Sequence, residues 1–134
     1  MELPEAARAM LRGKALGHVV TRNEGGSPQV TLVWVDEDNG DLMFNTNMSR
    51  KKADNLQRDP RVVVSVQNPE APMQYLVVRG RAELATEGAW EHIDHLSRKF
   101  SGNDYPRRDP AEERVMIRVK ASRISGAGPW MQPA

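Results

Sequence analysis

The residues best suited to chemistry are Ser49-Arg50-Lys51-Lys52, a hydroxyl followed by three adjacent cations. They come directly after a strand-like run at residues 42–47, and they open a helix-like stretch that ends at Asp59-Pro60. The first turn of a helix has unpaired backbone N–H groups and the positive end of the helix dipole, and both favour an anion. The run therefore predicts a phosphate-binding site. The alternative is a basic helix start that only faces water, as most charged runs do.

Other catalytic groups are few. His92 and His95 lie three residues apart in a helix-like stretch and could share a metal ion, but only Glu91 and Asp94 accompany them, at a spacing common on surface helices. The sequence has no cysteine, no Gly-x-Ser-x-Gly nucleophile motif and no glycine-rich phosphate loop. We therefore expect no metal site and no catalytic side chain, and we expect a bound cofactor to carry any reaction.

Length and composition restrict the class of protein. The 134 residues are enough for one domain with a single core, but few for enclosing a large cofactor, so a site shared by two subunits is expected. The absence of cysteine agrees with a reducing compartment. No apolar run is long enough to cross a membrane or to form a signal peptide, so we expect a cytoplasmic protein without membrane association. The net charge of +1 argues against general nucleic-acid binding.

The elements before the cationic run are a helix and two hairpins. A helix is predicted over residues 4–13, because a proline opens this stretch and a glycine closes it. Two β-branched runs, residues 16–22 and 28–35, flank a turn-forming segment and predict the first hairpin. Asn39-Gly40 supplies the positive-φ pair of a tight turn and predicts the second hairpin.

The elements after the run are mostly strands. They are, in order, a helix over residues 50–58, strands over 61–67 and 75–84, a helix over 87–100, and one or two strands over 115–119 and 121–125. The nearly continuous apolar character of residues 61–67 predicts a strand buried on both faces, and Gly80 is a candidate bulge. The apolar stripe of the helix over 87–100 is expected to pack on the core. Six or seven strands with short helices at the corners predict a small closed antiparallel barrel.

Four blocks of sequence resemble the pyridoxamine 5′-phosphate oxidase-like family of split β-barrels in order and spacing. The blocks are residues 26–35, 42–46, 50–62 and 77–82, and the resemblance covers residues 10 to 127. The sequence is most similar to the branch that uses the deazaflavin cofactor F420, the F420H2-dependent reductases. The resemblance implies a mainly β fold, a six- or seven-stranded antiparallel split β-barrel with peripheral helices, in one domain flanked by a helical segment at residues 1–14 and a tail at residues 127–134.

The resemblance also implies a homodimer with two cofactor sites at the subunit interface. Arg50, Lys51 and Lys52 would bind the cofactor phosphate, and Ser49 would cap the helix. By position, the other implied cofactor-binding residues are Gln29, Val30 and Thr31 along the ring, Thr46 and Asn47 beside the phosphate and ribityl chain, Tyr75 and Arg79 on a strand that faces the cofactor, and Trp130 in a tail that closes over the pocket. The alternative for Trp130 is packing on a neighbouring subunit. Pyridoxamine phosphate oxidases usually have glutamine where Tyr75 stands.

The function implied by the resemblance is hydride transfer from reduced F420 to an electron-poor small molecule such as a quinone, an enone or lactone, or a tetrapyrrole. His18, Tyr75 and Tyr105 are the near-neutral side chains that could supply a proton, and solvent is the other source. The alternatives are an FMN-dependent oxidoreductase of the same fold and a non-catalytic protein that binds flavin, F420 or heme. The arginine and histidine region with which pyridoxamine phosphate oxidases grip their substrate is not found here, so vitamin B6 oxidation is not expected.

Overall fold

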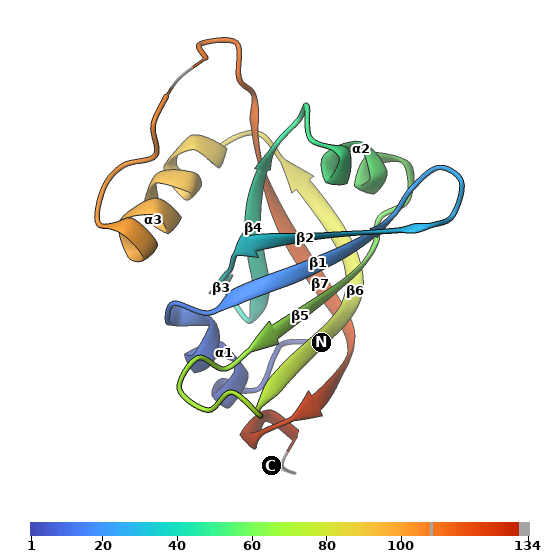
Figure 1. The fold of residues 1–134 in the computed structure, drawn as a ribbon, viewed down its shortest axis with the longest axis vertical. Coiled ribbons are helices and arrows are strands. Elements are labelled where there is room, and N and C mark those ends of the chain that lie inside the picture. Colours follow the sequence, from blue (N-terminus) through green and yellow to red (C-terminus); the bar gives the residue numbers. More distant parts are fainter. Residues whose placement is uncertain (108, 132–134) are drawn as a thin grey trace.

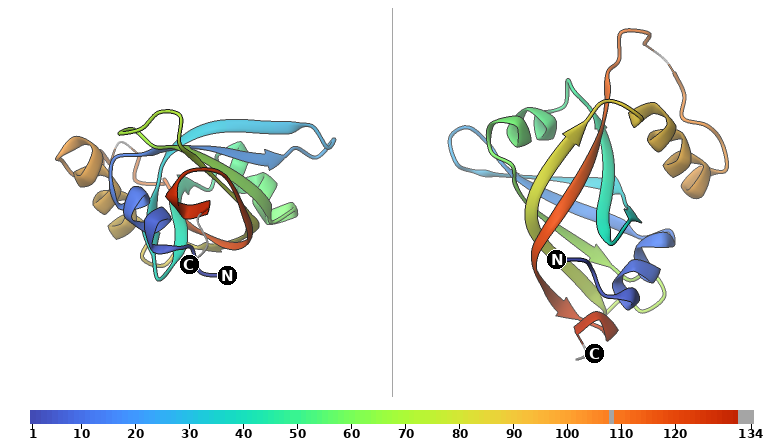
Figure 2. Two further views of the ribbon diagram at one scale, coloured as in Figure 1. Left: turned by 90° about the horizontal axis from the view of Figure 1, so that it is seen from below. Right: turned by 180° about the vertical axis from the view of Figure 1, so that it is seen from behind.

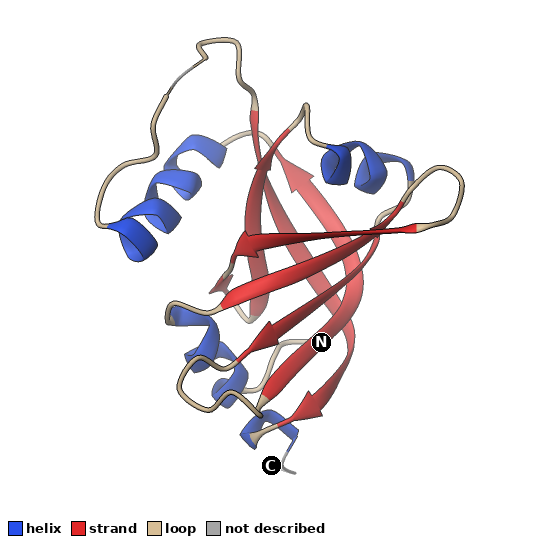
Figure 3. Ribbon diagram, viewed as in Figure 1, coloured by secondary structure: helices blue, strands red, loops and turns tan. Residues whose placement is uncertain are grey.

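The protein folds as a curled antiparallel sheet with short helices at both ends (Figure 1). The computed structural model describes residues 1–107 and 109–131. The strands in this part of the chain are β1 (Leu16–Arg22), β2 (Pro28–Trp34), β3 (Asp36–Asp38), β4 (Asp41–Asn47), β5 (Arg61–Gln67), β6 (Tyr75–Ala85) and β7 (Arg114–Ala127). The helices are α1 (Glu5–Arg12), α2 (Lys51–Arg58), α3 (Ala89–Ser101) and the 3-10 turn η1 (Pro129–Met131). The sheet order β2-β1-β5-β6-β7-β4-β3 and its half-barrel curl confirm the predicted mainly β split barrel with peripheral helices (Figure 3).

The two predicted hairpins are both present. β1 pairs with β2 along its whole length, and β3 pairs with β4 across a tight turn. The turn residues Asn39 and Gly40 have φ angles of 51° and 85°, which is the positive-φ pair that such turns require. The second hairpin therefore directs β4 towards α2, and the chain reaches the cationic run at the end of this strand.

Strand β5 lies inside the sheet, between β1 and β6. Val62, Val64 and Val66 are buried in the core, whereas Val63 and Ser65 on the opposite face are only half-buried. The prediction that this strand is buried on both faces is therefore confirmed for one face only. The other face differs from the prediction because it lies on the outside of the curl, away from the core.

The bulge and the last strand are linked. The pairing of β6 with β7 shifts register between Arg79 and Gly80, which confirms the bulge predicted at Gly80. A Cβ atom at Gly80 would lie 2.2 Å from the backbone oxygen of Lys120, so the two strands approach too closely there for any side chain. β7 is one continuous strand, where two were possible, because it pairs with β6 along almost its whole length, and its first residues also pair with β4.

The core closes at the end of the molecule that carries both termini (Figure 2). Leu3, Ala7 and Leu11 of the N-terminal segment pack into the same cluster as Trp130 of η1. Helices α2 and α3 lie at the opposite end, on either side of the end of β4 (Figures 1 and 2). None of the helices in the described part of the chain combines the length and apolar character that a membrane crossing requires.

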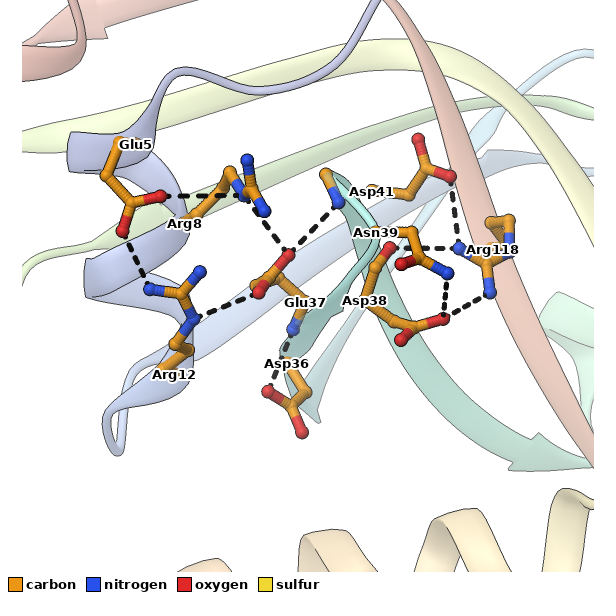
Figure 4. Close-up of polar contacts among 10 residues, drawn as sticks. Glu5, Arg8, Arg12, Asp36, Glu37, Asp38, Asn39, Asp41 and Arg118 are labelled. Carbon is orange, nitrogen blue, oxygen red and sulfur yellow. Dashed lines mark hydrogen bonds and ion pairs between the residues drawn. The ribbon is translucent and has the colours of Figure 1, made fainter.

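An ion network joins α1, the β3–β4 hairpin and β7 (Figure 4). We call it the Glu37 network; its members are Glu5, Arg8, Arg12, Glu37, Asp38, Asp41 and Arg118. The Glu37 carboxylate accepts hydrogen bonds from Arg12 Nε (2.9 Å) and from the backbone N–H of Gly40 (3.1 Å). Arg118 donates to Asp38 (2.7 Å) and Asp41 (3.0 Å). Carboxylates and guanidinium groups alternate, so each charge has a partner of opposite sign.

Candidate functional site

Helix α2 begins just after β4, and its first turn carries the cationic run. Arg50 is the N-cap residue, with φ −79° and ψ 146°, so Lys51 and Lys52 are the first two helical residues. No side chain caps the helix. The Ser49 hydroxyl instead donates to Asn47 Oδ1, which also accepts the Ser49 backbone N–H at 2.9 Å. The predicted helix cap by Ser49 is therefore wrong, because the helix starts one residue later and the local turn uses the hydroxyl.

Buried Asn55 fixes α2 against the β1–β2 hairpin. Its Nδ2 donates to Thr21 Oγ1 and to Asn23 Oδ1, both at 3.0 Å. The Thr21 hydroxyl in turn donates to Gln29 Oε1 at 3.3 Å. These bonds set the position of the cationic turn relative to β2. β2 is an edge strand, so part of its backbone is unpaired and available to a ligand.

A cleft of about 470 Å³ lies beside the cationic turn. Its residues come from β1, β2, β4, α2, α3, β7 and the loop before β7, and they are Leu16, Thr31, Leu32, Val33, Trp34, Asn45, Thr46, Arg50, Lys52, Ile93, Leu96, Tyr105 and Arg114. Arg50, Lys52 and Arg114 are cations, and no carboxylate is among the described residues that line the cleft. One part of the cleft is thus cationic and another part apolar. Such a cavity suits a ligand with an anionic group and a flat apolar body.

Two polar groups in this cleft lack a partner within the described chain. Lys52 is only 9% exposed, and burial, followed by the nearby charges of Arg50 and Arg114, lowers the pKa of its ammonium group. None of the described residues supplies an opposing charge that raises it. The Thr31 hydroxyl oxygen is buried without a hydrogen bond. Burial of a charge or a hydroxyl without a partner costs free energy, and an anion that accepts hydrogen bonds would supply what both groups lack.

Arg114 is the main site residue that the sequence analysis missed. It is 6% exposed, and its Nε donates to Asn45 Oδ1 (3.0 Å) while its Nη1 donates to Glu112 Oε1 (2.7 Å). Asn47 Nδ2 also donates to Glu112, at 3.3 Å. The available signal was an arginine at the start of a strand-like run. Its proximity to the cationic turn depends on the pairing of β4 with β7, which brings Asn47 opposite Arg114.

Aromatic side chains form one wall of the cleft. Trp34 stacks on Phe100, with ring centroids 5.3 Å apart and an interplanar angle of 7°. Tyr105 meets Trp34 edge to face at 6.4 Å, and the Arg114 guanidinium lies 4.9 Å from the Tyr105 ring centroid. Tyr105 and Arg50 also line a second cavity of about 620 Å³. The two cavities therefore meet at these two side chains.

Helix α3 contributes to the cleft as well as to the core. Ile93 and Leu96 of its predicted apolar stripe are buried, and both line the cleft. His92 Nδ1 lies 3.0 Å from Asn45 Nδ2, and burial lowers the pKa of His92 to about 4. His95 instead contacts Asp36, with Nε2 2.9 Å from Oδ2. The histidines have separate partners, and the residues that the structure describes contain no group of three or more His, Asp or Glu side chains able to hold a metal.

The structure brings together part of the predicted cofactor-binding set. Thr31, Thr46, Arg50 and Lys52 line the cleft, and Asn47 and Ser49 line the second cavity. Gln29 and Val30 precede Thr31 on β2, and Lys51 is exposed and lines neither cavity.

The remaining predicted residues lie elsewhere. Arg79 is exposed on the outer face of the sheet, where it lines a separate hollow with Arg22 and Arg61. Trp130 is buried in the core, and its Nε1 donates to the backbone oxygen of Tyr75 at 3.0 Å. It belongs to η1, and the C-terminal end of the chain lies at the end of the molecule opposite α2 (Figure 1). The prediction that Trp130 closes over the cleft is therefore wrong within its own chain, because the indole completes the core beside α1. Residues 132–134 of the predicted tail lie outside the described residues.

Comparison with known families identifies the fold. The sequence pattern of the family described as pyridoxamine 5′-phosphate oxidase matches residues 3–127. The chain belongs to this family. The match includes all the strands and the cationic turn, and it confirms the family resemblance found in the four sequence blocks. No curated protein matches this chain.

Solved structures of similar fold include an F420 reductase. It shares 29% identity with this family member at a TM-score of 0.78, and the similarity covers 92% of this chain and 98% of the other. A protein from Mycobacterium tuberculosis is 21% identical, with a TM-score of 0.75 over 94% of this chain and 84% of the other. HupZ of Group A Streptococcus is 19% identical, with a TM-score of 0.67 over 92% and 93%. The last two similarities show the shared fold only. Family membership and the F420 reductase similarity together indicate an oxidoreductase that binds a flavin or deazaflavin.

Proposed function

We propose that the protein is an F420H2-dependent reductase that passes a hydride to an electron-poor small molecule such as a quinone, an enone or lactone, or a tetrapyrrole. The observation that carries the proposal is the cleft in which Arg50 and Lys52 have no carboxylate partner among the described residues, while Arg114, paired with Glu112, lies beside them. The similarity to an F420 reductase over almost the whole chain supports the choice of cofactor.

The residues of the cleft fit such a cofactor. Arg50 and Lys52 would bind its phosphate, since charge-assisted hydrogen bonds to phosphate are the strong ones, and the Thr31 hydroxyl would bind a polar edge of its ring. Leu16, Trp34 and the α3 residues would cover the ring and exclude water. When bound, reduced F420 supplies a hydride from C5 of its ring. The protein's contribution is to hold the cofactor and the acceptor in contact in a site shielded from solvent.

We also propose a homodimer formed through the outer face of the sheet. Val30 and Leu32 of β2 are 57% and 56% exposed, and Leu16 of β1 is 41% exposed. Val20 and Val63 are only half-buried and continue this apolar surface across β1 and β5. Contiguous exposed apolar surface is typical of an interface.

We expect light scattering to give twice the monomer mass, and we expect Val30→Glu to shift the measured mass towards that of the monomer. A monomeric wild-type protein at micromolar concentration would contradict the proposal.

The dimer would also explain two residues that lie away from the cleft of their own chain. Tyr75 and Arg79 are both exposed, and Arg79 pairs across the sheet with Val63 of the apolar surface. In a dimer formed through this surface, they are candidates for contact with the cofactor of the partner subunit. A cytoplasmic location and the absence of nucleic-acid and membrane partners stay predictions from composition.

The test of the proposed function is a pair of titrations with FMN and F420 at equal ionic strength, followed by turnover with reduced F420 and a quinone. We expect tighter binding of F420, because its longer tail carries carboxylates in addition to the phosphate, and oxidation of reduced F420 above background. Tighter FMN binding without oxidation of reduced F420 would assign the protein to the alternative, an FMN-dependent oxidoreductase of the same fold. Binding of either cofactor without turnover would indicate a carrier.

A further inference from the structure

Tyr105 occupies the junction of the two cavities with a phenol that the fold does not use. The two hydrogen bonds that it makes to described residues involve its backbone: its N–H donates to Asp94 Oδ1 (3.0 Å), and its carbonyl oxygen accepts from Arg107 (3.2 Å). Its ring is held between Trp34 and Arg114. Backbone and ring are therefore fixed, while the hydroxyl remains available to a ligand.

The other two near-neutral side chains do not share this position. His18 is exposed on β1 and Tyr75 is exposed at the start of β6, and neither lines the cleft. Lys52 does line the cleft, but its charge is needed for the cofactor phosphate in the proposed function. Tyr105 is thus the side chain in the described cleft that can donate a proton without giving up a cofactor contact.

We propose that Tyr105 is the proton donor of the reduction, and that the acceptor is a flat, uncharged molecule with a conjugated carbonyl oxygen, a quinone or an enone. This inference rests on the proposed function. A conjugated carbonyl that accepts a hydride at carbon gains an electron pair, which moves to its oxygen. The phenolic O–H bond of Tyr105 breaks and a new O–H bond forms on the acceptor, which is then reduced by two electrons in total. The hydride donor is oxidised, and the phenolate regains its proton from water.

The surroundings of Tyr105 favour both halves of this proton transfer. A phenol is protonated at neutral pH and so is ready to donate. The Arg114 guanidinium lies 4.9 Å from the centroid of the Tyr105 ring and keeps this ring at the edge of the cleft. Tyr105 also lines the larger second cavity, through which water can return the proton. On the cleft side it contacts Trp34 and shares the lining with Leu16 and Leu96, and this apolar lining favours an apolar acceptor.

The experiment compares Tyr105→Phe, which keeps the ring and removes the hydroxyl, with Tyr105→Leu, which removes both. With reduced F420 and 2-methyl-1,4-naphthoquinone, we expect Tyr105→Phe to lower kcat by about 100-fold or more, the scale of general acid catalysis, with F420 affinity unchanged. Tyr105→Leu should weaken ligand binding as well, because the wall between the cavities is lost. Thr86→Ala, which removes an exposed hydroxyl outside the cleft, is the control and should keep the wild-type kcat. A Tyr105→Phe variant with wild-type kcat would overturn the proposal and assign the proton to solvent.

A binding measurement tests the same contact without turnover. The chain has two tyrosines, so protein labelled with ¹³C at the tyrosine ring carbon that bears the hydroxyl gives two resonances, which Tyr75→Phe assigns. We expect the naphthoquinone to shift the Tyr105 resonance in protein without cofactor. An unchanged Tyr105 resonance at saturating quinone would overturn the proposal. Failure of the wild-type protein to bind F420 would instead refute the proposed function, and the two failures are therefore distinguishable.

Discussion

Two charged regions of the molecule differ in how their charges are satisfied. In the Glu37 network every carboxylate faces a guanidinium, and the links join three elements that are distant in sequence (Figure 4). In the cleft, Arg50, Lys52 and Arg114 line one cavity without a carboxylate among its described residues. Arg114 has a partner just outside the lining, in Glu112, but Lys52 has none in the described chain.

This difference in pairing distinguishes charges that bind one another within the fold from charges that are available to bind a ligand. A paired and hydrogen-bonded charge recovers part of its desolvation cost from its partner, whereas an unpaired buried charge does not. The charges of the Glu37 network are therefore satisfied in the free protein, and removing one of them would leave its partner unpaired. We expect the largely buried Lys52 ammonium to reduce the stability of the free protein, and we expect that cost to be offset when an anion binds. Variants in the two regions should consequently have opposite effects on stability and binding.

The largest effect is expected from Lys52→Met, which keeps an unbranched side chain of similar length and removes the charge. Loss of one charge-assisted hydrogen bond, about 1.5–3 kcal/mol, should weaken F420 or FMN binding by about tenfold or more. The free energy of unfolding of the ligand-free protein should rise, because an unpaired buried charge is gone. Titration of the cofactor and urea denaturation measure the two effects. Lys14→Met, at an exposed lysine, is the matched control and should change neither the cofactor affinity nor the free energy of unfolding. A Lys52→Met protein with wild-type cofactor affinity would show that Lys52 lies outside the ligand site.

The opposite pattern is expected from Glu37→Gln. The side chain is 8% exposed, and the change removes the charge that faces Arg8 and Arg12 while keeping the size of the side chain. We expect the free energy of unfolding to fall by about 1–3 kcal/mol, the cost of leaving buried hydrogen-bonding groups poorly paired, with cofactor affinity unchanged. Urea denaturation and cofactor titration again give both values. Glu24→Gln at the exposed hairpin turn is the control, and a cofactor affinity that fell in parallel with the stability would show that the two regions are coupled.

His92 lies between the two regions and predicts a dependence of stability on pH. It contacts Asn45 of the cleft and lines a small cavity with Asp36 and Asp38. Burial lowers its pKa from 6.5 to about 4, so the folded protein resists protonation that the unfolded chain accepts. Stability should therefore be unaffected by this group above pH 6.5, fall as the pH drops from 6.5 to about 4, and not fall further below that. Urea midpoints at pH 7, 5.5 and 4.5 should show a smaller decline for His92→Gln than for the wild type; parallel declines would refute the assignment.

Local sequence patterns predicted much of the fold because the signals are short-range. Asn39-Gly40 specifies its turn by backbone conformation, and Gly80 marks the place where β6 and β7 approach too closely for a side chain. The single strand β7 and the half-covered β5 were not predictable, since both depend on how the sheet curls. Trp130 was misplaced for the same reason, because its position in the core depends on the packing of both chain ends.

The candidate site was predicted only where its residues are neighbours in sequence. The cationic turn with Arg50 and Lys52 was recognised from its charges and its place at a helix start. Arg114 was missed, because it reaches the cleft through a hydrogen bond to Asn45, 69 residues away. Tyr105 was noted as a near-neutral side chain, but its contact with Trp34 depends on how the loop after α3 folds back. Long-range pairing of this kind has no local signature.

The smallest effect is expected from Lys51→Met, and it refines the comparison within the cationic turn itself. Lys51 is exposed and lines neither cavity, whereas its neighbour Lys52 is buried in the cleft. An exposed charge contributes about 0–1 kcal/mol, so cofactor affinity should fall by no more than about fivefold. That loss should disappear at high salt, since exposed charges are screened, while the loss from Lys52→Met should largely persist. Cofactor titrations of both variants at low and high salt measure these losses of affinity. If the two variants lost the same affinity with the same dependence on salt, both lysines would contact the ligand at the surface, and their difference in burial would have no effect on binding.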